Sequence, residues 1–320
     1  MNRHLLLILD GYGIAEDPSV SAIDAAAKPF LDYLFATAPH STLEASGRAV
    51  GLPAGLMGNS EVGHTNLGAG RVVYQEISRI DKAIEDGTFF ENDVLTGAAR
   101  HAKANGTTLH LLGLVSDGGV HSHLDHLVAL LDLAKREGLT GDQVVVHAFT
   151  DGRDTAPEGG VGYLRSVQAA MDRLGVGVVG SVVGRYWAMD RDRRWPRIRK
   201  AYDLLTRGEV GDDGTTTDDV VGALEAQYAA GAADAIAAPV YNFRADRARQ
   251  LTSAFTGTLL PDYDALTDEI PVAGDLDLHY ATFTPYHKAF DVPVAFPKQD
   301  LTDTLGETVA KAGGTQLRAA

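Results

Sequence analysis

Short runs of apolar residues alternate along this chain with segments whose apolar residues recur every three or four positions. The runs have the length of buried β-strands, and the periodic segments have the spacing of helices that bury one face. This order of strand, polar loop and helix predicts an α/β fold, in which a parallel sheet carries helices on both faces. The predicted strands are Leu5–Leu9, Thr108–Val115, Val144–Phe149 and Val176–Val183, with a shorter strand and turn in Ser41–Leu52.

Helices are predicted between and after these strands. Leu124, Leu127, Leu131 and Ala134 share one face of a helix that runs on to Lys135. Pro29 is expected to break the first helix or to begin a new one, because proline has no amide hydrogen. The other predicted helices are Ile23–Phe35, Ile77–Ile84, Asn92–Ala104 (ending in the turn Asn105-Gly106), Tyr163–Leu174, Trp195–Thr206, Asp219–Ala230 and Leu301–Ala312.

Composition limits the class of protein. The 320 residues, 45% of them hydrophobic, suffice for two domains of ordinary size. No apolar run is long enough to span a membrane, and the first one ends in Asp10 without a signal-peptide cleavage site. The absence of cysteine excludes disulfides and thiolate chemistry, which together with the missing signal predicts a cytoplasmic protein. A net charge of −15 argues against nucleic-acid binding.

A glycine-rich stretch, residues 55–71, displays Ser60 between Asn59 and Glu61. Such a serine can act as a nucleophile, but the only nearby imidazole is that of His64, and no Asp-His pair flanks it. A metal ion is the other means of activating a hydroxyl. The alternative interpretation is a purely structural glycine-rich loop.

Asp10 directly follows the first predicted strand and precedes Gly11-Tyr12-Gly13. Ligands of open α/β sheets gather at the carboxyl ends of the strands, so Asp10 is placed to hold a metal ion. A loop aspartate that caps the next segment is an equally good interpretation of this residue alone.

The loops after the later strands share one chemistry, because they carry His121 and several arginines into what the fold predicts to be one edge of the sheet. A single surface arginine is inert by default, but five in such loops of an acidic chain form a pattern. The planar guanidinium binds phosphate or carboxylate with two hydrogen bonds. A small phosphorylated or carboxylated ligand is therefore predicted, and the arginines concerned are Arg153, Arg185, Arg191, Arg244 and Arg247.

The segment His121-Ser-His-Leu-Asp-His126 permits two interpretations. It matches the His-x-His-x-Asp-His pattern with which hydrolases of the metallo-β-lactamase fold bind two metal ions. Those folds are mainly antiparallel sandwiches, whereas this segment lies within strand-helix alternation. We therefore prefer one functional histidine, His121, with structural roles for His123 and His126.

Seven segments of the chain, in this order, resemble signature segments of the cofactor-independent (2,3-bisphosphoglycerate-independent) phosphoglycerate mutases. They cover nearly the whole chain and are highly specific. The segments are Asp10-Gly-Tyr-Gly13, Met57-Gly-Asn-Ser-Glu-Val-Gly-His64, His121-Ser-His-Leu-Asp-His126, Asp151-Gly-Arg-Asp154, Gly184-Arg-Tyr186, Met189-Asp-Arg191 and Asn242-Phe-Arg-Ala-Asp-Arg-Ala-Arg-Gln250.

The resemblance implies an alkaline-phosphatase-like parallel-sheet domain, incomplete in this chain, with an inserted α/β phosphotransferase domain. Residues 1–76 would begin the phosphatase domain, 77–293 would form the inserted, substrate-binding domain, and 294–320 would begin the returning half. The segment Ala230–Pro239 is shorter than the family pattern, and Pro239 interrupts an expected strand.

The resemblance also implies an isomerase of glycolysis that interconverts 3-phosphoglycerate and 2-phosphoglycerate through a phosphoserine, with two Mn²⁺ ions, in a monomer. Ser60 would be the metal-bound nucleophile and Asp10 a metal ligand. The implied substrate-binding residues are His121, Arg153, Asp154, Arg185, Arg191, Arg244 and Arg247.

The family's catalytic lysine segment and its later aspartate and histidine metal ligands do not occur in this sequence. A catalytic metal ion needs about three protein ligands, which Asp10 and Ser60 cannot supply for two ions. Little or no mutase turnover is therefore expected of this chain alone. Two alternatives stay open: an inactive phosphoglycerate-binding remnant, and a metal-dependent phosphatase of the same superfamily.

Overall fold

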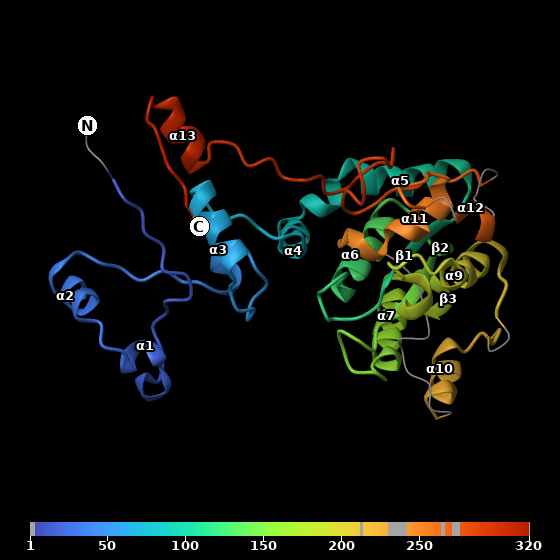
Figure 1. Ribbon diagram of the computed structural model, residues 1–320. Coiled ribbons are helices and arrows are strands. Elements are labelled where there is room, and N and C mark those ends of the chain that lie inside the picture. Colours follow the sequence, from blue (N-terminus) through green and yellow to red (C-terminus); the bar gives the residue numbers. More distant parts are fainter. Residues whose placement is uncertain (1–3, 212–213, 230–241, 264–265, 271–275, 320) are drawn as a thin grey trace. The chain divides into compact units, whose positions relative to one another are not determined.

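The computed structural model describes residues 4–211, 214–229, 242–263, 266–270 and 276–319. The chain forms two compact units, shown in Figure 1, and each is described here by itself. The first unit combines Met1–Ser78 with Asp300–Ala320, and the second is Arg79–Gln299. The first division falls inside helix α4 (Glu76–Asp86). No described helix has both the length and the apolar character needed to cross a membrane.

A parallel sheet of three strands lies at the centre of the second unit. Its strands, β1 (Leu109–Leu114), β2 (Gly141–Thr150) and β3 (Val176–Gly184), are hydrogen-bonded in that order. Leu114 pairs with Phe149, and Thr150 pairs with Gly184, so the three carboxyl ends lie at one edge. This confirms the parallel α/β sheet predicted from the apolar runs.

Helices cover both faces of this sheet. Leu114 and Phe149 belong to a buried cluster with residues of α9 (Trp195–Arg207) and α11 (Arg249–Thr256). Val146 and Ala148 point to the opposite face, because side chains alternate along a strand, and they too are fully buried. Three helices pack successively against one another and against the strands: α5 (Asp93–Asn105), α6 (Leu124–Arg136) and α7 (Gly160–Leu174).

The ends of these helices follow from their capping residues. Asn92 begins α5, since its Oδ1 accepts hydrogen bonds from the amides of Val94 and Leu95. Gly106 ends the same helix with a φ of 64°, a left-handed conformation that glycine adopts without strain. The predicted turn at Asn105-Gly106 is thereby confirmed. The other elements among the described residues of this unit are η3 (Thr88–Glu91), α8 (Arg185–Ala188), α10 (Val220–Ala229), η5 (Ala245–Arg247) and α12 (Leu266–Glu269).

The first unit consists of short elements. Pro29 is the first residue of α2 (Pro29–Thr37), which confirms that a new helix begins there after α1 (Ala22–Ala25). The others are η1 (Pro18–Val20), η2 (Gly47–Val50), α3 (Ser60–Ala69) and α13 (Leu305–Lys311), whose capping box is formed by Thr304 and Glu307.

Two strand predictions in this unit are wrong. Leu5–Leu9 forms no strand, and Leu5 is 86% exposed. Residues 41–52 contain the 3₁₀ turn η2 instead of a strand. A strand requires a second strand to which it is hydrogen-bonded. None of the described residues of this unit belongs to a strand that could pair with these segments. Apolar character alone therefore does not produce the strand.

Candidate functional site

Three loops meet at the carboxyl edge of the sheet. The chain leaves β1 into a loop that carries His121, leaves β2 at Asp151, and passes from β3 directly into Arg185 at the start of α8. The amide of Phe243 donates a 2.8 Å hydrogen bond to the carbonyl of His121, which joins the segment after Asn242 to the first loop. The sequence thus assembles one site from four separate segments.

Asp151 lies at the centre of the loops and is fully buried. Its Oδ1 accepts hydrogen bonds from the amides of Arg153 and Asp154 and from Arg185 Nη1, and its Oδ2 accepts one of 2.8 Å from Ser116 Oγ. Burial alone would raise the pKa of Asp151, but these hydrogen bonds and the charge of Arg185 hold that pKa below its ordinary value. The carboxylate of Asp151 is therefore charged, and both of its oxygens already accept hydrogen bonds.

His121 lies between two carboxylates. Its Nε2 is 3.8 Å from Asp154 Oδ2, and its Nδ1 is 3.8 Å from Asp246 Oδ1. Burial, assisted by the positive charge of Arg185, lowers the pKa of His121 to about 4, although the two aspartates act in the opposite direction. At neutral pH the imidazole is uncharged, so it can accept a proton or donate a hydrogen bond to a ligand.

Asp246 holds two of the predicted arginines. Arg191 Nη1 lies 3.2 Å from Asp246 Oδ2, and Arg244 Nε lies 3.2 Å from Asp246 Oδ1. The two guanidinium side chains are about half exposed, with exposed fractions of 49% and 50%. Exposed ion pairs of this kind contribute little to stability, so both arginines can exchange the carboxylate for a ligand.

Arg247 completes the group, and its Nη1 donates to the carbonyl of Met189 at 3.1 Å. Burial and the positive charges of Arg185, Arg153 and Arg191 together lower the pKa of Arg247. Like charges affect one another in this way only when they are close, so Arg153, Arg185 and Arg191 lie near Arg247, while Arg244 is placed by its contact with Asp246. Arg185 also has a buried Nη2 without a hydrogen-bond partner among the described residues. The arrangement presents guanidinium groups suited to an anion.

The three histidines of the His121–His126 segment have different hydrogen-bond or ion-pair partners. His123 caps α6, with its Nδ1 accepting from the amide of Asp125, and His126 is buried with its Nε2 2.7 Å from Asp81 of α4. No group of three or more His, Asp or Glu suited to a metal ion occurs in the described part of the chain. This geometry favours structural roles for His123 and His126.

Ser60 belongs to the first unit, where it is the first residue of α3. Gly58 precedes it because a side chain there would meet the carbonyl oxygen of Ala45, 1.9 Å from the position of a Cβ. His64 Nδ1 lies 2.9 Å from the carbonyl of Ser60 and 3.3 Å from its Oγ. Since the carbonyl only accepts, Nδ1 carries the hydrogen and cannot take a proton from Oγ in this arrangement.

Asp10 is exposed and forms the turn that the sequence predicts, with Gly11 at a φ of 74°. Neither Asp10 nor Ser60 belongs to a cluster of metal-binding side chains among the described residues. The donor set of the described residues therefore does not fit the two metal ions that the family resemblance implies.

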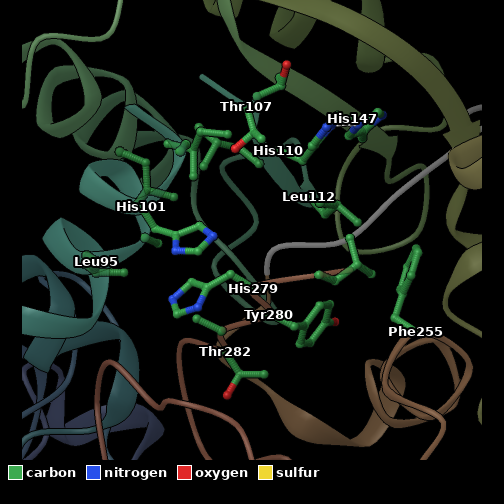
Figure 2. A pocket seen from close by; sticks show the side chains of 18 of the residues that line it. Leu95, His101, Thr107, His110, Leu112, His147, Phe255, His279, Tyr280 and Thr282 are labelled. Carbon is green, nitrogen blue, oxygen red and sulfur yellow. Dashed lines mark hydrogen bonds between the residues drawn. The ribbon is translucent and has the colours of Figure 1, made fainter. Parts of the chain in front are cut away.

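A cavity of about 630 Å³ lies elsewhere in the second unit, beside β1 (Figure 2). Figure 2 shows His101 and His279 near each other in its wall, and their rings stack at 4.6 Å. Its described wall contains no lysine or arginine. An anionic ligand would find no guanidinium or ammonium group in this described wall, so the arginine group suits such a ligand better.

Residues 80–241, about half of the chain, match the protein family described as the N-terminus of the BPG-independent phosphoglycerate mutases. This match includes the β-sheet, His121 and the first three of the predicted arginines. The chain belongs to this family.

Curated relatives of the mutase family extend the match to almost the whole chain. The chain is 56% identical to the 2,3-bisphosphoglycerate-independent phosphoglycerate mutase of Salinibacter ruber. This alignment covers 99% of the present chain and 64% of the Salinibacter mutase. It is 49% identical to that of Moorella thermoacetica, over 100% of its length and again 64% of the relative. The chain thus spans about two thirds, or slightly less, of these mutases.

A solved structure of the same family is also similar. It is a crystal structure of the Leishmania mexicana phosphoglycerate mutase at low cobalt concentration, with a TM-score of 0.63 and 27% identity. The match covers 91% of this chain and 57% of that one.

The alignment with the Salinibacter mutase has 343 positions, 23 more than the 320 residues of this chain. Some segment is therefore shorter here than in that mutase. We predicted a shortfall within Ala230–Pro239, but this segment and Pro239 lie outside the described residues.

Two carboxylates of the candidate site were missed by reasoning from the sequence. Asp151 and Asp246 both lie within the quoted signature segments, yet only Asp154 and the neighbouring arginines were singled out. The available signal was position, since Asp151 is the first residue after a buried strand and Asp246 lies between two arginines. An aspartate among arginines is easily interpreted as simple charge balance.

Proposed function

We propose that the second unit of this chain binds phosphoglycerate as the substrate-binding part of a phosphoglycerate mutase. The observation that carries the proposal is that arginines gather around two aspartates on either side of His121. Arg185 contacts Asp154, and Arg191 and Arg244 both contact Asp246. Burial and the charges of Arg185, Arg153 and Arg191 lower the pKa of Arg247 nearby. Phosphoglycerate bears a phosphate and a carboxylate, and a group of forked guanidinium donors can bind both.

In the proposed complex the residues make different contacts with the ligand. The buried Nη2 of Arg185 donates to the ligand, while Arg191 and Arg244 exchange Asp246 for its oxygens. His121, neutral at pH 7 because its pKa lies at about 4, donates or accepts a hydrogen bond at a glycerate oxygen. Arg153, Asp154 and Arg247 complete the contacts.

For the complete reaction we propose the interconversion of 3-phosphoglycerate and 2-phosphoglycerate, in glycolysis, with a phosphoserine at Ser60. The position of Ser60 at the amino end of α3 supports this role, since the helix dipole stabilises negative charge there. Mn²⁺ with Asp10 as a ligand belongs to the proposal through the family resemblance alone. We derive no step through the metal, because its ligand set is not found among the described residues. A cytoplasmic, monomeric protein is part of the same proposal.

The binding claim is tested by calorimetric titration of 3-phosphoglycerate into the unmodified chain and into Arg244→Ala. Arg173→Ala is the matched control, because Arg173 is an exposed arginine of α7 away from the loops. We expect weaker binding for Arg244→Ala and unchanged binding for Arg173→Ala. If the unmodified chain releases no heat, the arginine site is wrong.

A second candidate, a phosphoglycerate-binding remnant without turnover, is favoured by the division of the candidate residues between two compact units. All of the arginine-site residues lie in the second unit, whereas Ser60 and Asp10 lie in the first. An enolase-coupled assay with Mn²⁺ distinguishes the candidates. We expect little or no turnover from this chain alone, and robust rates would overturn that expectation. Phosphate release without isomerisation would instead indicate a phosphatase.

A further inference from the structure

The carboxyl ends of all three strands are joined through one buried side chain. Ser116, just after β1, donates to Asp151 Oδ2 at 2.8 Å. Asp151 itself directly follows β2. Arg185, the first residue after β3, donates to Asp151 Oδ1 through its Nη1. A single carboxylate thus connects the segments that form the candidate site.

The same carboxylate also fixes the turn after β2. The amides of Arg153 and Asp154 donate to Asp151 Oδ1 at 3.2 and 3.0 Å. Asp154 in turn accepts a 2.7 Å hydrogen bond from Arg185 Nη1 through its Oδ2, and that oxygen is 3.8 Å from His121 Nε2. The positions of Arg153, Asp154 and Arg185 are therefore mutually dependent.

Arg185 has an asymmetric environment. Its Nη1 contacts both aspartates, while its Nη2 is buried and has no hydrogen-bond partner among the described residues. A buried donor that stays unpaired carries an energetic penalty, which is removed when a ligand oxygen accepts from it. Two carboxylates that hold one side of the guanidinium fork leave the other side oriented for a ligand.

We propose that Asp151 is a positioning residue for phosphoglycerate, which fixes Arg185 and the Arg153–Asp154 turn before the ligand arrives. Asp151 does not touch the ligand, because its two oxygens are used by Ser116, Arg185 and the turn. Its contribution is pre-organisation: the ordering of Arg185 takes place in folding, so that binding does not incur that loss of entropy. This inference rests on the proposed binding function.

The test is a double-mutant cycle on the dissociation constant of 3-phosphoglycerate, measured by calorimetry with the full chain. Asp151→Asn keeps the shape of the side chain but removes its charge, and we expect about tenfold weaker binding. If Asp151 acts through Arg185, then Asp151→Asn causes little further loss in a chain that already carries Arg185→Ala. A merely structural role would weaken binding by the same factor in both backgrounds, and this additivity would overturn the proposal.

Two controls accompany the cycle. Asp81→Asn removes the negative charge from the partner of another part-buried hydrogen bond, that of His126, and is expected to lower stability without changing the dissociation constant. Ser116→Ala removes only the bond to Oδ2, and we expect a smaller loss of affinity than for Asp151→Asn. Unchanged affinity in Asp151→Asn, with binding by the unmodified chain, would refute the positioning role alone. Absence of binding by the unmodified chain would refute the binding function itself.

A measurement on the unmodified chain covers the case in which Asp151→Asn does not fold. The guanidinium nitrogens of Arg185 are expected to give separate Nη1 and Nη2 resonances in NMR spectra without ligand, because the two aspartates prevent rotation. A single averaged signal, like that of the exposed Arg173, would contradict pre-organisation.

Discussion

At the scale of single residues, burial separates the arginines of the site into two kinds. The side chain of Arg185 is 4% exposed and contacts two aspartates, whereas those of Arg191 and Arg244 are about half exposed and share Asp246. Solvent screens the exposed pairs but not the buried one. In the proposed complex we therefore expect Arg185 to act as a fixed donor, and Arg191 and Arg244 as donors that exchange Asp246 for the ligand.

This difference predicts unequal effects of lysine substitution. Lysine keeps the charge but loses the planar fork, so Arg185→Lys should weaken binding of 3-phosphoglycerate by about tenfold or more. Arg244→Lys should weaken it by no more than about threefold, because an exposed ammonium can still reach the ligand. Calorimetric titration of both variants checks this, and equal losses would contradict the assignment.

His147 leads to a prediction about pH. Its Nε2 lies 2.9 Å from His110 Nδ1, and its Nδ1 lies 2.9 Å from Ser181 Oγ. Burial, and then the charge of His110, lowers the pKa of His147 from 6.5 to about 4. The folded protein therefore keeps His147 neutral, while the unfolded chain takes up a proton below pH 6.5. The resulting stability is present above pH 6.5 and is lost as the pH falls towards 4.

Between pH 6.5 and 4 the free energy of unfolding of the second unit should fall, with His147 contributing up to about 1.4 kcal/mol per pH unit. Urea titrations followed by tryptophan fluorescence measure this, since Trp187 and Trp195 both lie in the second unit. His147→Gln keeps a side chain that can form hydrogen bonds but cannot be protonated in this range. Its slope with pH should be shallower, and an unchanged slope would refute the role of His147.

At the scale of elements, the side chain of Asn92 connects two segments that are distant in sequence. Asn92 Oδ1 caps α5, and its Nδ2 donates to the carbonyl of Ala295 at 2.7 Å. Ala295 belongs to a segment in which the amide of Thr282 donates to Pro293, and that of Ala295 to Thr282. One amide side chain therefore begins a helix and also anchors the end of the second unit.

Asn92→Ala should lower the free energy of unfolding of the second unit by about 1–3 kcal/mol, because it removes the cap and the bond to Ala295. The matched control is Asn59→Ala, which removes the corresponding cap of α3 in the first unit. Tryptophan-monitored unfolding should respond to the first substitution and not to the second. Equal shifts would show that the two units unfold as one.

The elements that were predicted correctly are those whose sequence pattern and surroundings agree. β1, β2 and β3 form because each apolar run has a hydrogen-bonded neighbour and helices over both faces. Leu5–Leu9 has an equally apolar sequence but is exposed and unpaired among the described residues. The sequence pattern reports that a segment can be buried, whereas a strand also depends on a partner that the segment itself does not specify.

At the scale of the whole molecule, the candidate site lies entirely within the second unit. Its core includes Phe149, Ile198 and Leu251, which are contributed by the sheet and by helices of the same unit. A unit with its own core should fold by itself. The first unit contains Ser60 and Asp10 but few buried large side chains among its described residues.

The excised fragment 79–299 is therefore expected to fold and to bind 3-phosphoglycerate within about twofold of the full chain's dissociation constant. Circular dichroism and calorimetry test the two parts of this prediction. A folded fragment with much weaker binding would show that the first unit contributes to the site.

The sequence predicted that arginines would gather in a candidate site, but it did not predict the side-chain contacts that hold them. Parallel strands place their carboxyl ends at one edge, so the convergence of Arg153 and Arg185 followed from the order of strands and loops. The contacts of Asp151 and Asp246 depend on side-chain directions across loops distant in sequence, which no local pattern encodes. The same limit applies to His121, whose burial between aspartates becomes apparent only in the folded chain.

The most direct test of the central claim is a titration of 3-phosphoglycerate followed by the side-chain NMR resonances of the arginines. We predict that the signals of Arg153, Arg185, Arg191, Arg244 and Arg247 shift together with one dissociation constant, while that of Arg173 stays unchanged. If these signals do not move, or move no more than that of Arg173, the five arginines do not form a phosphoglycerate site.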